Sequence, residues 1–181
     1  MKVEETSLPG VLLITTRVFE DDRGAFYESF NLQRMAEAGL PSRWAQDNFS
    51  HSRANVLRGI HYQTIQPQGK LVSAVYGTVL DMAVDLRRSS PYFGKHVAVE
   101  LAGKSGRMLW IPEGFGHAFL VLSETAGFAY KVTDYYSAAG ERAIAWNDPD
   151  LAIPWPVKAE DAVVSAKDQA GAALHDAEVF A

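Results

Sequence analysis

Residues 70–86 read KLVSAVYGTVLDMAVDL, and this stretch decides the fold class. Two runs rich in β-branched and aliphatic residues, 70–76 and 78–86, are separated only by Gly77. Runs of this kind predict β-strands, and the glycine between them predicts a tight turn. The stretch therefore predicts two consecutive strands in a chain that builds its core from β-sheet.

Shorter runs of the same kind flank this pair, with turns rich in Gly, Pro, Asp and Asn between them. Further strands are predicted at 11–18, 97–101, 107–111, 118–123 and 127–136. A turn is predicted at 20–24 and one helix at 31–38, which Asn31 can cap and Gly39 can end. Regularly spaced short strands are typical of a sandwich, a jelly roll or a barrel.

The length of 181 residues fits one domain, 1–181. Its Ala-rich C-terminal strap, residues 157–181, is expected to hold a short helix or irregular chain. Hydrophobic residues make up 48% of the sequence and charged residues 22%, as in a soluble globular protein. No apolar run is long enough to span a membrane, and the N-terminus lacks a signal-peptide core. We therefore expect a cytoplasmic protein.

Charge and cysteine content narrow the possible functions. The net charge of −5 argues against nucleic acid and anionic membranes as partners. The chain has no cysteine, which excludes disulfides and thiolate metal sites. An anionic substrate would need a local cluster of basic residues.

Two of the five histidines have neighbours that suggest chemistry. Strand alternation places His61 and Gln63 on one face and Arg58 on the other, unless a bulge at Gly59 turns Arg58 back. Two interpretations of this segment are equally consistent with it. His61 is either a hydrogen-bonded core residue beside a surface arginine, or part of a site.

The second histidine lies in Pro112-x-Gly114-x-x-His117, which resembles the second motif of the cupin superfamily, where the histidine often binds a metal. The first cupin motif supplies His-x-His and a glutamate. The corresponding positions here are His61-Tyr62-Gln63, followed by Lys70. Glutamine is a poor ligand and an ammonium group repels a cation, so a metal site is disfavoured.

Taken together, these segments resemble the dTDP-4-dehydrorhamnose 3,5-epimerases nearly from end to end. The matching motifs, in chain order, are Phe19-x-Asp21-x-Arg23-Gly24-x-Phe26-x-Glu28, Gln46-Asp47-Asn48-x-Ser50, Leu57-Arg58-Gly59-Ile60-His61-Tyr62-Gln63, Gln68-Gly69-Lys70-Leu71-Val72, Asp81-x-Ala83-Val84-Asp85-Leu86-Arg87, Ser90-Pro91-x-Phe93-Gly94, Pro112-Glu113-Gly114-Phe115-Gly116-His117-Ala118-Phe119, Tyr130-Lys131-x-Thr133-x-Tyr135-Tyr136, Trp146-Asn147-Asp148-Pro149 and Ser165-Ala166-Lys167-Asp168. Each motif is weak alone, and their common order makes the resemblance specific.

The resemblance implies a mainly β, cupin-type double-sheet jelly roll with a few short helices. It also implies a homodimer without metal or cofactor, acting on a dTDP-4-keto-6-deoxyhexose. His61 corresponds to the general base, Asp168 to its carboxylate partner and Tyr130 to the proton donor on the opposite sugar face. Family positions that contact the nucleotide-sugar correspond to Arg23, Glu28, Gln46, Asp47, Asn48, Arg58, Lys70, His117, Glu141 and Lys167. The N-terminal strands are expected to contribute Arg23 and Glu28 to the partner's site.

The chemistry of these residue types fits an epimerase. C3 and C5 of the sugar both adjoin the C4 ketone, so loss of either proton gives an enolate. Histidine titrates near neutrality and suits the base role, and a carboxylate at Asp168 would favour the imidazolium that forms. Lys70 is the candidate for stabilising the enolate oxygen, and arginines match the diphosphate.

Three alternatives remain open at this stage. The first is a mono-epimerase that inverts only C3 or only C5 of a related dTDP-sugar in an antibiotic or deoxysugar pathway. The second is a metal-dependent cupin enzyme, and the third is a non-catalytic sugar-binding jelly roll. Whether His61 and Asp168 touch also stays open, because they are far apart in sequence.

Overall fold

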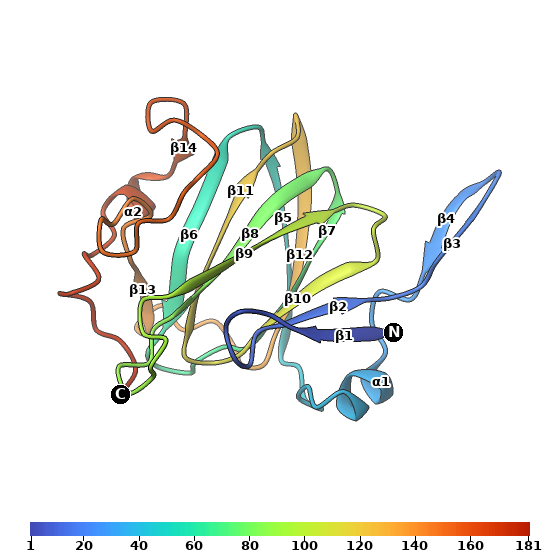
Figure 1. Ribbon diagram of the computed structural model, residues 1–181, viewed down its shortest axis with the longest axis horizontal. Coiled ribbons are helices and arrows are strands. Elements are labelled where there is room, and N and C mark those ends of the chain that lie inside the picture. The colour runs from blue at the N-terminus through green and yellow to red at the C-terminus, as the bar shows by residue number, and fades with distance from the viewer.

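A computed structural model describes residues 1–181 as two facing β-sheets (Figure 1). The first sheet contains, in order, β1 (Lys2–Glu5), β2 (Leu12–Thr15), β10 (Arg107–Ile111), β7 (Lys70–Tyr76), β12 (Thr125–Val132) and β5 (Gln46–Arg53). The second contains β13 (Glu141–Ala143), β6 (Val56–Gln63), β11 (Phe115–Val121), β8 (Thr78–Asp85) and β9 (His96–Ala102), with β14 (Val163–Val164) beside β6. The predicted double-sheet jelly roll is confirmed.

Side-chain alternation gives each sheet an inner face that points toward the other sheet. Val72 and Phe128 of the first sheet belong to the same buried cluster as Ala83, Phe115 and Phe119 of the second. The rings of Phe119 and Phe128 stack with their centroids 4.3 Å apart. The core between the sheets therefore follows directly from the period-two pattern of the strands.

The outer faces of the two sheets have different covers. On the first sheet, Met35 of α1 (Leu32–Glu37) packs against Leu71 and Trp110. On the second sheet, Ile60 and Met82 pack against Leu174 of the C-terminal strap. The strap holds the second short helix, α2 (Ala166–Gln169), and Figure 1 shows it lying against the β6 side. It is thus anchored to the strand that carries His61.

Most predicted strands are present with small changes at their ends, but the N-terminal region differs from the prediction. The strand predicted at 11–18 ends at Thr15. The predicted turn at 20–24 lies inside a separate hairpin of β3 (Val18–Asp21) and β4 (Gly24–Tyr27). Strand β5 was not predicted, because its alternating polar side chains carry no apolar pattern.

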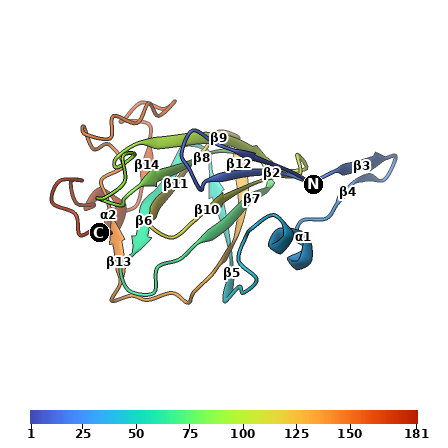
Figure 2. The ribbon, with the colours of Figure 1, turned by 60° about the horizontal axis from the view of Figure 1, so that its bottom comes forward.

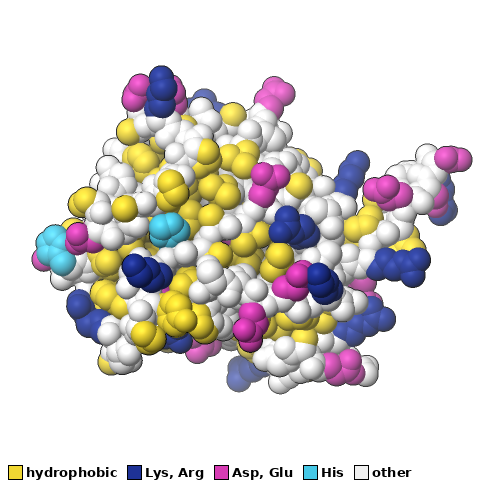
Figure 3. Space-filling view, viewed as in Figure 1, with side chains coloured by type: hydrophobic (Ala, Val, Ile, Leu, Met, Phe, Trp, Pro, Cys, Tyr) yellow, Lys and Arg dark blue, Asp and Glu magenta, His cyan; other side chains and the backbone are white.

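The β3–β4 hairpin, called the arm below, pairs with neither main sheet. Figures 1 and 2 show it projecting from the body at the end opposite the C-terminal strap. In Figure 3 the tip of this projection carries side chains of both charges. Phe19 and Phe26 on the arm are 51% and 72% exposed, which is unusual for large apolar side chains in an isolated chain.

A bulge in β6 decides which way its polar residues point. His61 pairs with His117 and Arg58 with Phe119, so Gly59 and Ile60 together face the single residue Ala118. This extra residue places Arg58 and His61 on the same inner face, as the bulge interpretation predicted.

No helix in the structure is long and apolar enough to cross a membrane.

We predict that Gly59→Ala destabilises the fold by about 3 kcal/mol or more. Gly59 has φ +118°, and a Cβ there would lie 2.5 Å from the Ala118 side chain and the His117 carbonyl. Gly24→Ala is the matched control, because Gly24 has φ +129° with no atom near its would-be Cβ. Urea unfolding should show a loss of only about 1 kcal/mol for the control. Equal losses would mean that packing against β11 costs nothing.

Candidate active site

Strand register gathers most of the predicted site residues on the inner faces. Tyr130 lies opposite Val72 and Asn48, and His61 lies opposite His117. The inner-face positions of the predicted set are Gln46, Asn48, Arg58, His61, Lys70, His117, Tyr130 and Glu141. These residues come from six strands, and the C-terminal strap adds Lys167 and Asp168.

His61 and Asp168 are in contact. His61 Nε2 donates to Asp168 Oδ1 at 2.6 Å, and Asp168 is only 3% exposed. The Ser165 hydroxyl caps α2 by accepting from the Asp168 backbone N–H, and Gly59 N approaches Asp168 Oδ2 at 3.4 Å. Burial opposes ionisation of Asp168, but these hydrogen bonds and the His61 charge together lower its pKa.

Lys70 is a buried lysine at the start of β7. Its Nζ donates to the His61 carbonyl at 3.3 Å, and the residue is 8% exposed. Burial lowers the pKa of Lys70 to about 8, although the negative charges of Asp81 and Glu141 act in the other direction. The amine therefore remains protonated in the main at neutral pH while lying in a site with little water.

Tyr130 extends from β12 toward the second sheet. Burial raises its pKa, the Arg58 guanidinium opposes this rise, and Glu141 adds to it. The phenol is therefore neutral and protonated at neutral pH. Arg58 is itself held across the gap between the sheets, because its Nε donates to Ser52 Oγ on β5 at 3.2 Å.

His117 is held by a residue that sequence reasoning missed. Its Nε2 donates to Asp81 Oδ1 at 2.7 Å, and both side chains are buried. Burial lowers the pKa of His117, so the ring is neutral. A sequence signal existed, because Asp81 interrupts the apolar run 78–86, and a charge in such a strand needs a partner.

Glu141 and Lys167 form an ion pair at the edge of this cluster. Glu141 also accepts from the Tyr136 hydroxyl at 2.8 Å. Burial opposes ionisation of Glu141, yet the hydrogen bonds from Lys167 and Tyr136 lower its pKa overall. Tyr136 belongs to the family-like motif that begins at Tyr130, and no role was predicted for it from the sequence. Its side chain is exposed.

The three polar residues at the start of β5 separate between the two faces of the sheet. Gln46 and Asn48 point inward, and Gln46 Nε2 donates to Asn48 Oδ1 at 2.7 Å. Asp47 points outward, where it pairs with Lys131 at 2.7 Å. The side chain of Asp47 therefore lies away from the other site residues.

The structure also keeps Arg23 and Glu28 apart from the cluster of their own chain. Arg23 lies at the tip of the arm, where its side chain is 90% exposed and pairs with Asp21. Glu28 follows β4 and pairs with Arg34 of α1 at 3.1 Å.

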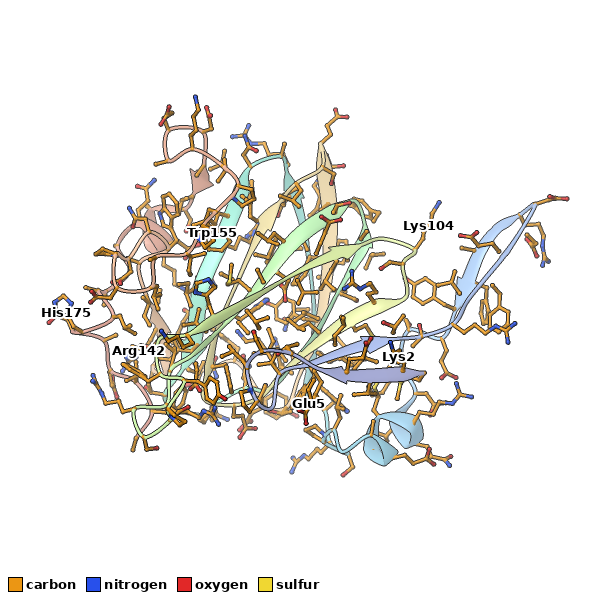
Figure 4. The ribbon with its side chains drawn as sticks, in the orientation of Figure 1. Lys2, Glu5, Lys104, Arg142, Trp155 and His175 are labelled. Carbon is orange, nitrogen blue, oxygen red and sulfur yellow. The ribbon has the colours of Figure 1, made fainter.

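The remaining histidines lie outside the cluster. His51 is on the outer face of β5 and contacts Tyr76, and His96 begins β9. His175 is exposed at the edge of the strap (Figure 4). No three His, Asp or Glu side chains are grouped so as to hold a metal ion. The Lys70 amine donates to the His61 carbonyl and lies near His117, so a cationic side chain stands beside both histidines.

Comparison of the sequence with known proteins shows which family the chain belongs to. The profile of the family described as dTDP-4-dehydrorhamnose 3,5-epimerase matches residues 5–176. A protein of that name from Pseudomonas aeruginosa is 50% identical over 181 residues, covering 99% of each chain. A dTDP-4-dehydrorhamnose 3-epimerase from Streptomyces niveus is 37% identical, over 98% of this chain and 86% of its own.

A solved structure extends the likeness to three dimensions. It is that of dTDP-6-deoxy-D-glucose-3,5-epimerase from Legionella pneumophila in complex with dTDP-4-keto-L-rhamnose. Its TM-score is 0.94 at 47% identity, with 98% of this chain and 94% of that chain covered. The cupin-type jelly roll is thereby confirmed. Because the family profile spans nearly the whole chain and a relative shares half of its residues, this protein belongs to the dTDP-4-dehydrorhamnose 3,5-epimerase family, whose members are isomerases that act on carbohydrates.

Proposed function

We propose that this protein inverts C3 and C5 of dTDP-4-dehydro-6-deoxy-D-glucose to give dTDP-4-dehydro-L-rhamnose. The observation that carries the proposal is the His61–Asp168 hydrogen bond, with His61 on the inner face of the second sheet and with Lys70 and Tyr130 on the facing inner face of the first. A base, a cation and a phenol are the three groups that proton removal, enolate stabilisation and proton return require.

His61 is the proposed base. Its Nε2 proton is held by Asp168, so the lone pair at Nδ1 is the one available to take a proton from carbon. The Asp168 carboxylate stabilises the imidazolium that results. Its lowered pKa keeps this carboxylate ionised through the neutral range.

Lys70 and Tyr130 complete the proposed cycle. When the proton leaves C3 or C5, negative charge develops on the C4 oxygen, and the Lys70 ammonium offsets it in a site with little water. Tyr130 then donates its phenolic proton to the opposite face of the same carbon, which inverts the centre. The raised pKa of Tyr130 supports this role, because it keeps the acid form present.

The charged and amide groups around these three residues suit a nucleotide-sugar. Arg58 and Lys167 supply positive charge for the diphosphate, in a chain whose net charge is −5. Gln46, Asn48, Glu141 and His117 are proposed to orient the sugar and the nucleoside. Asp47 stays in the proposed substrate set only through its backbone, because its side chain is on the outer face.

We also propose a homodimer in which each arm completes the partner's site. The arm carries exposed Phe19 and Phe26, and the outer face of the first sheet carries exposed Phe49 and Val75. A hollow of about 450 Å³ lies between the arm and that face. A second copy would cover this apolar surface and bring Arg23 and Glu28 to another chain's cluster.

A mono-epimerase is the second candidate function. The named 3-epimerase among the relatives favours it, because the same family includes enzymes that act at one carbon. Both candidates need the same base, acid and cation, so only the number of inverted carbons separates them.

The first prediction from the proposed function concerns hydrogen exchange in D₂O, followed by NMR of the sugar. Wild-type protein should introduce deuterium at C3 and C5 and invert both, and His61→Asn should abolish exchange at both. Tyr130→Phe should keep exchange but slow inversion by about 100-fold or more, because the proton returns to the face it left. Binding of dTDP should change little in Tyr130→Phe.

Two controls and two outcomes make this experiment decisive. His175→Asn and Tyr92→Phe change exposed residues outside the cluster and should match wild type. Exchange at only one carbon would favour the mono-epimerase, and exchange at neither carbon would overturn the proposed function.

A second prediction follows from the pKa of Lys70. The exchange rate should fall about tenfold per pH unit above pH 8, as the amine loses its proton. Lys70→Met should be at least about 100-fold slower and should lack this fall. A pH profile between 6.5 and 9.5 measures both effects, and an unchanged profile in Lys70→Met would remove Lys70 from the mechanism.

Titration of Lys70 itself does not lower the rate by unfolding the chain. The pKa of Lys70 is about 8 in the folded chain and about 10.4 in the unfolded one, so between these values the unfolded state binds the extra proton. The free energy of unfolding therefore rises with pH, by about 1.4 kcal/mol per pH unit from this group. Urea unfolding of wild type and Lys70→Met over the same pH range gives the comparison.

A third prediction tests the shared site by mixing variants. Arg23→Ala and His61→Asn chains are each expected to be inactive. If the arm acts on the partner, each mixed dimer has one intact site, so an equal mixture should regain about a quarter of wild-type activity. If Arg23 acts within its own chain, no mixed dimer has an intact site and the mixture stays inactive.

A further inference from the structure

Asp81 is a charged residue in the middle of the core. It lies on the inner face of β8 beside Ala83, pairs in register with Phe119, and is 0% exposed. One carboxylate oxygen, Oδ1, accepts from His117 Nε2 at 2.7 Å. The other oxygen, Oδ2, is buried and has no hydrogen-bond partner. A buried carboxylate with one hydrogen bond costs stability, unless a nearby positive charge compensates it.

We propose that Asp81 is a positioning residue of the active site, which fixes the direction of hydrogen bonding at His117 and holds Lys70 in its ammonium form. The consequence for catalysis rests on the proposed function, because it uses the role of Lys70 at the enolate oxygen. The contacts of Asp81 do not depend on that function.

The effect on His117 follows from its tautomer. A neutral imidazole carries one proton, and the hydrogen bond to Asp81 Oδ1 places that proton on Nε2. The lone pair is then on Nδ1. His117 therefore offers an acceptor, and it selects a donor such as a sugar hydroxyl.

The effect on Lys70 follows from its surroundings. The Lys70 amine has one hydrogen-bond acceptor, the neutral carbonyl of His61. The titratable and charged groups around it are Asp81 on β8, Glu141 on β13, His117 on β11 and His61 on β6. Of the two carboxylates, Glu141 is already paired with Lys167 and Tyr136, whereas Asp81 keeps an oxygen free.

Asp81→Asn tests the proposal, since it removes the charge and keeps the shape. The readout is a ¹³C NMR titration of the Lys70 Cε, assigned by its loss in Lys70→Met. The titration midpoint should lie near pH 8 in wild type and about 1 pH unit lower in Asp81→Asn. Asp85→Asn is the matched control, because Asp85 is a buried carboxylate on the same strand that pairs with Arg87 instead. It should leave the Lys70 midpoint unchanged.

The exchange assay supplies the second readout. The pH at which the exchange rate begins to fall should be lower by the same amount in Asp81→Asn. At pH 7.5 this is a loss of about threefold in rate. Mere loss of structure would lower the rate at every pH and would not move the pH at which the fall begins. An unmoved midpoint, or equal movement in Asp85→Asn, would overturn the proposal. A wild-type protein without exchange would instead overturn the proposed function and leave the titration as the test of Asp81.

A measurement on wild-type protein covers the case in which Asp81→Asn does not fold. The ¹⁵N shifts of His117 at pH 7 should show the proton on Nε2 and the lone pair on Nδ1. A proton on Nδ1, or a doubly protonated ring, would contradict the proposed action of Asp81.

Discussion

The hydrogen bond between His61 and Asp168 joins residues 107 positions apart, and the rest of the site depends on it. It forms because the C-terminal strap packs its apolar side chains on the outer face of the second sheet. That packing brings α2 to the side of β6, where Ser165 caps the helix and orients the Asp168 backbone. The strap is thus both a cover for apolar surface and the support of the carboxylate that holds His61.

A second constraint is the separation of the two faces of each sheet. The inner faces hold an apolar cluster around Phe119 and Phe128 and, beside it, the polar cluster around Lys70. The ionisable groups of this polar cluster have identifiable partners. Asp168 is hydrogen-bonded to His61, Glu141 is paired with Lys167, and Lys70 has the negative charges of Asp81 and Glu141 near it. Low solvent content strengthens these interactions, and it would also strengthen the proposed action of the Lys70 amine on an enolate.

The arm shows the opposite behaviour, because its apolar residues are exposed and its charged tip is far from the polar cluster of its own chain. Within a single chain, nothing covers the apolar side chains of this projecting hairpin. A second copy of the chain would cover this apolar surface and contact the charged tip. In the proposed homodimer the arm would add residues to the partner's site, while the proposed base, acid and cation belong to one chain.

Strand alternation and turn residues are local signals, so the sequence alone was enough to give the fold class, and its ordered motifs were enough to give the family. It did not reveal β5, whose polar alternation resembles a loop, or the partner of His117. It could not decide whether Arg58 faced the site, which required the bulge at Gly59. Only the tertiary structure brought Asp168 to His61 and turned Asp47 outward, because those placements depend on register between strands and on packing between segments distant in sequence.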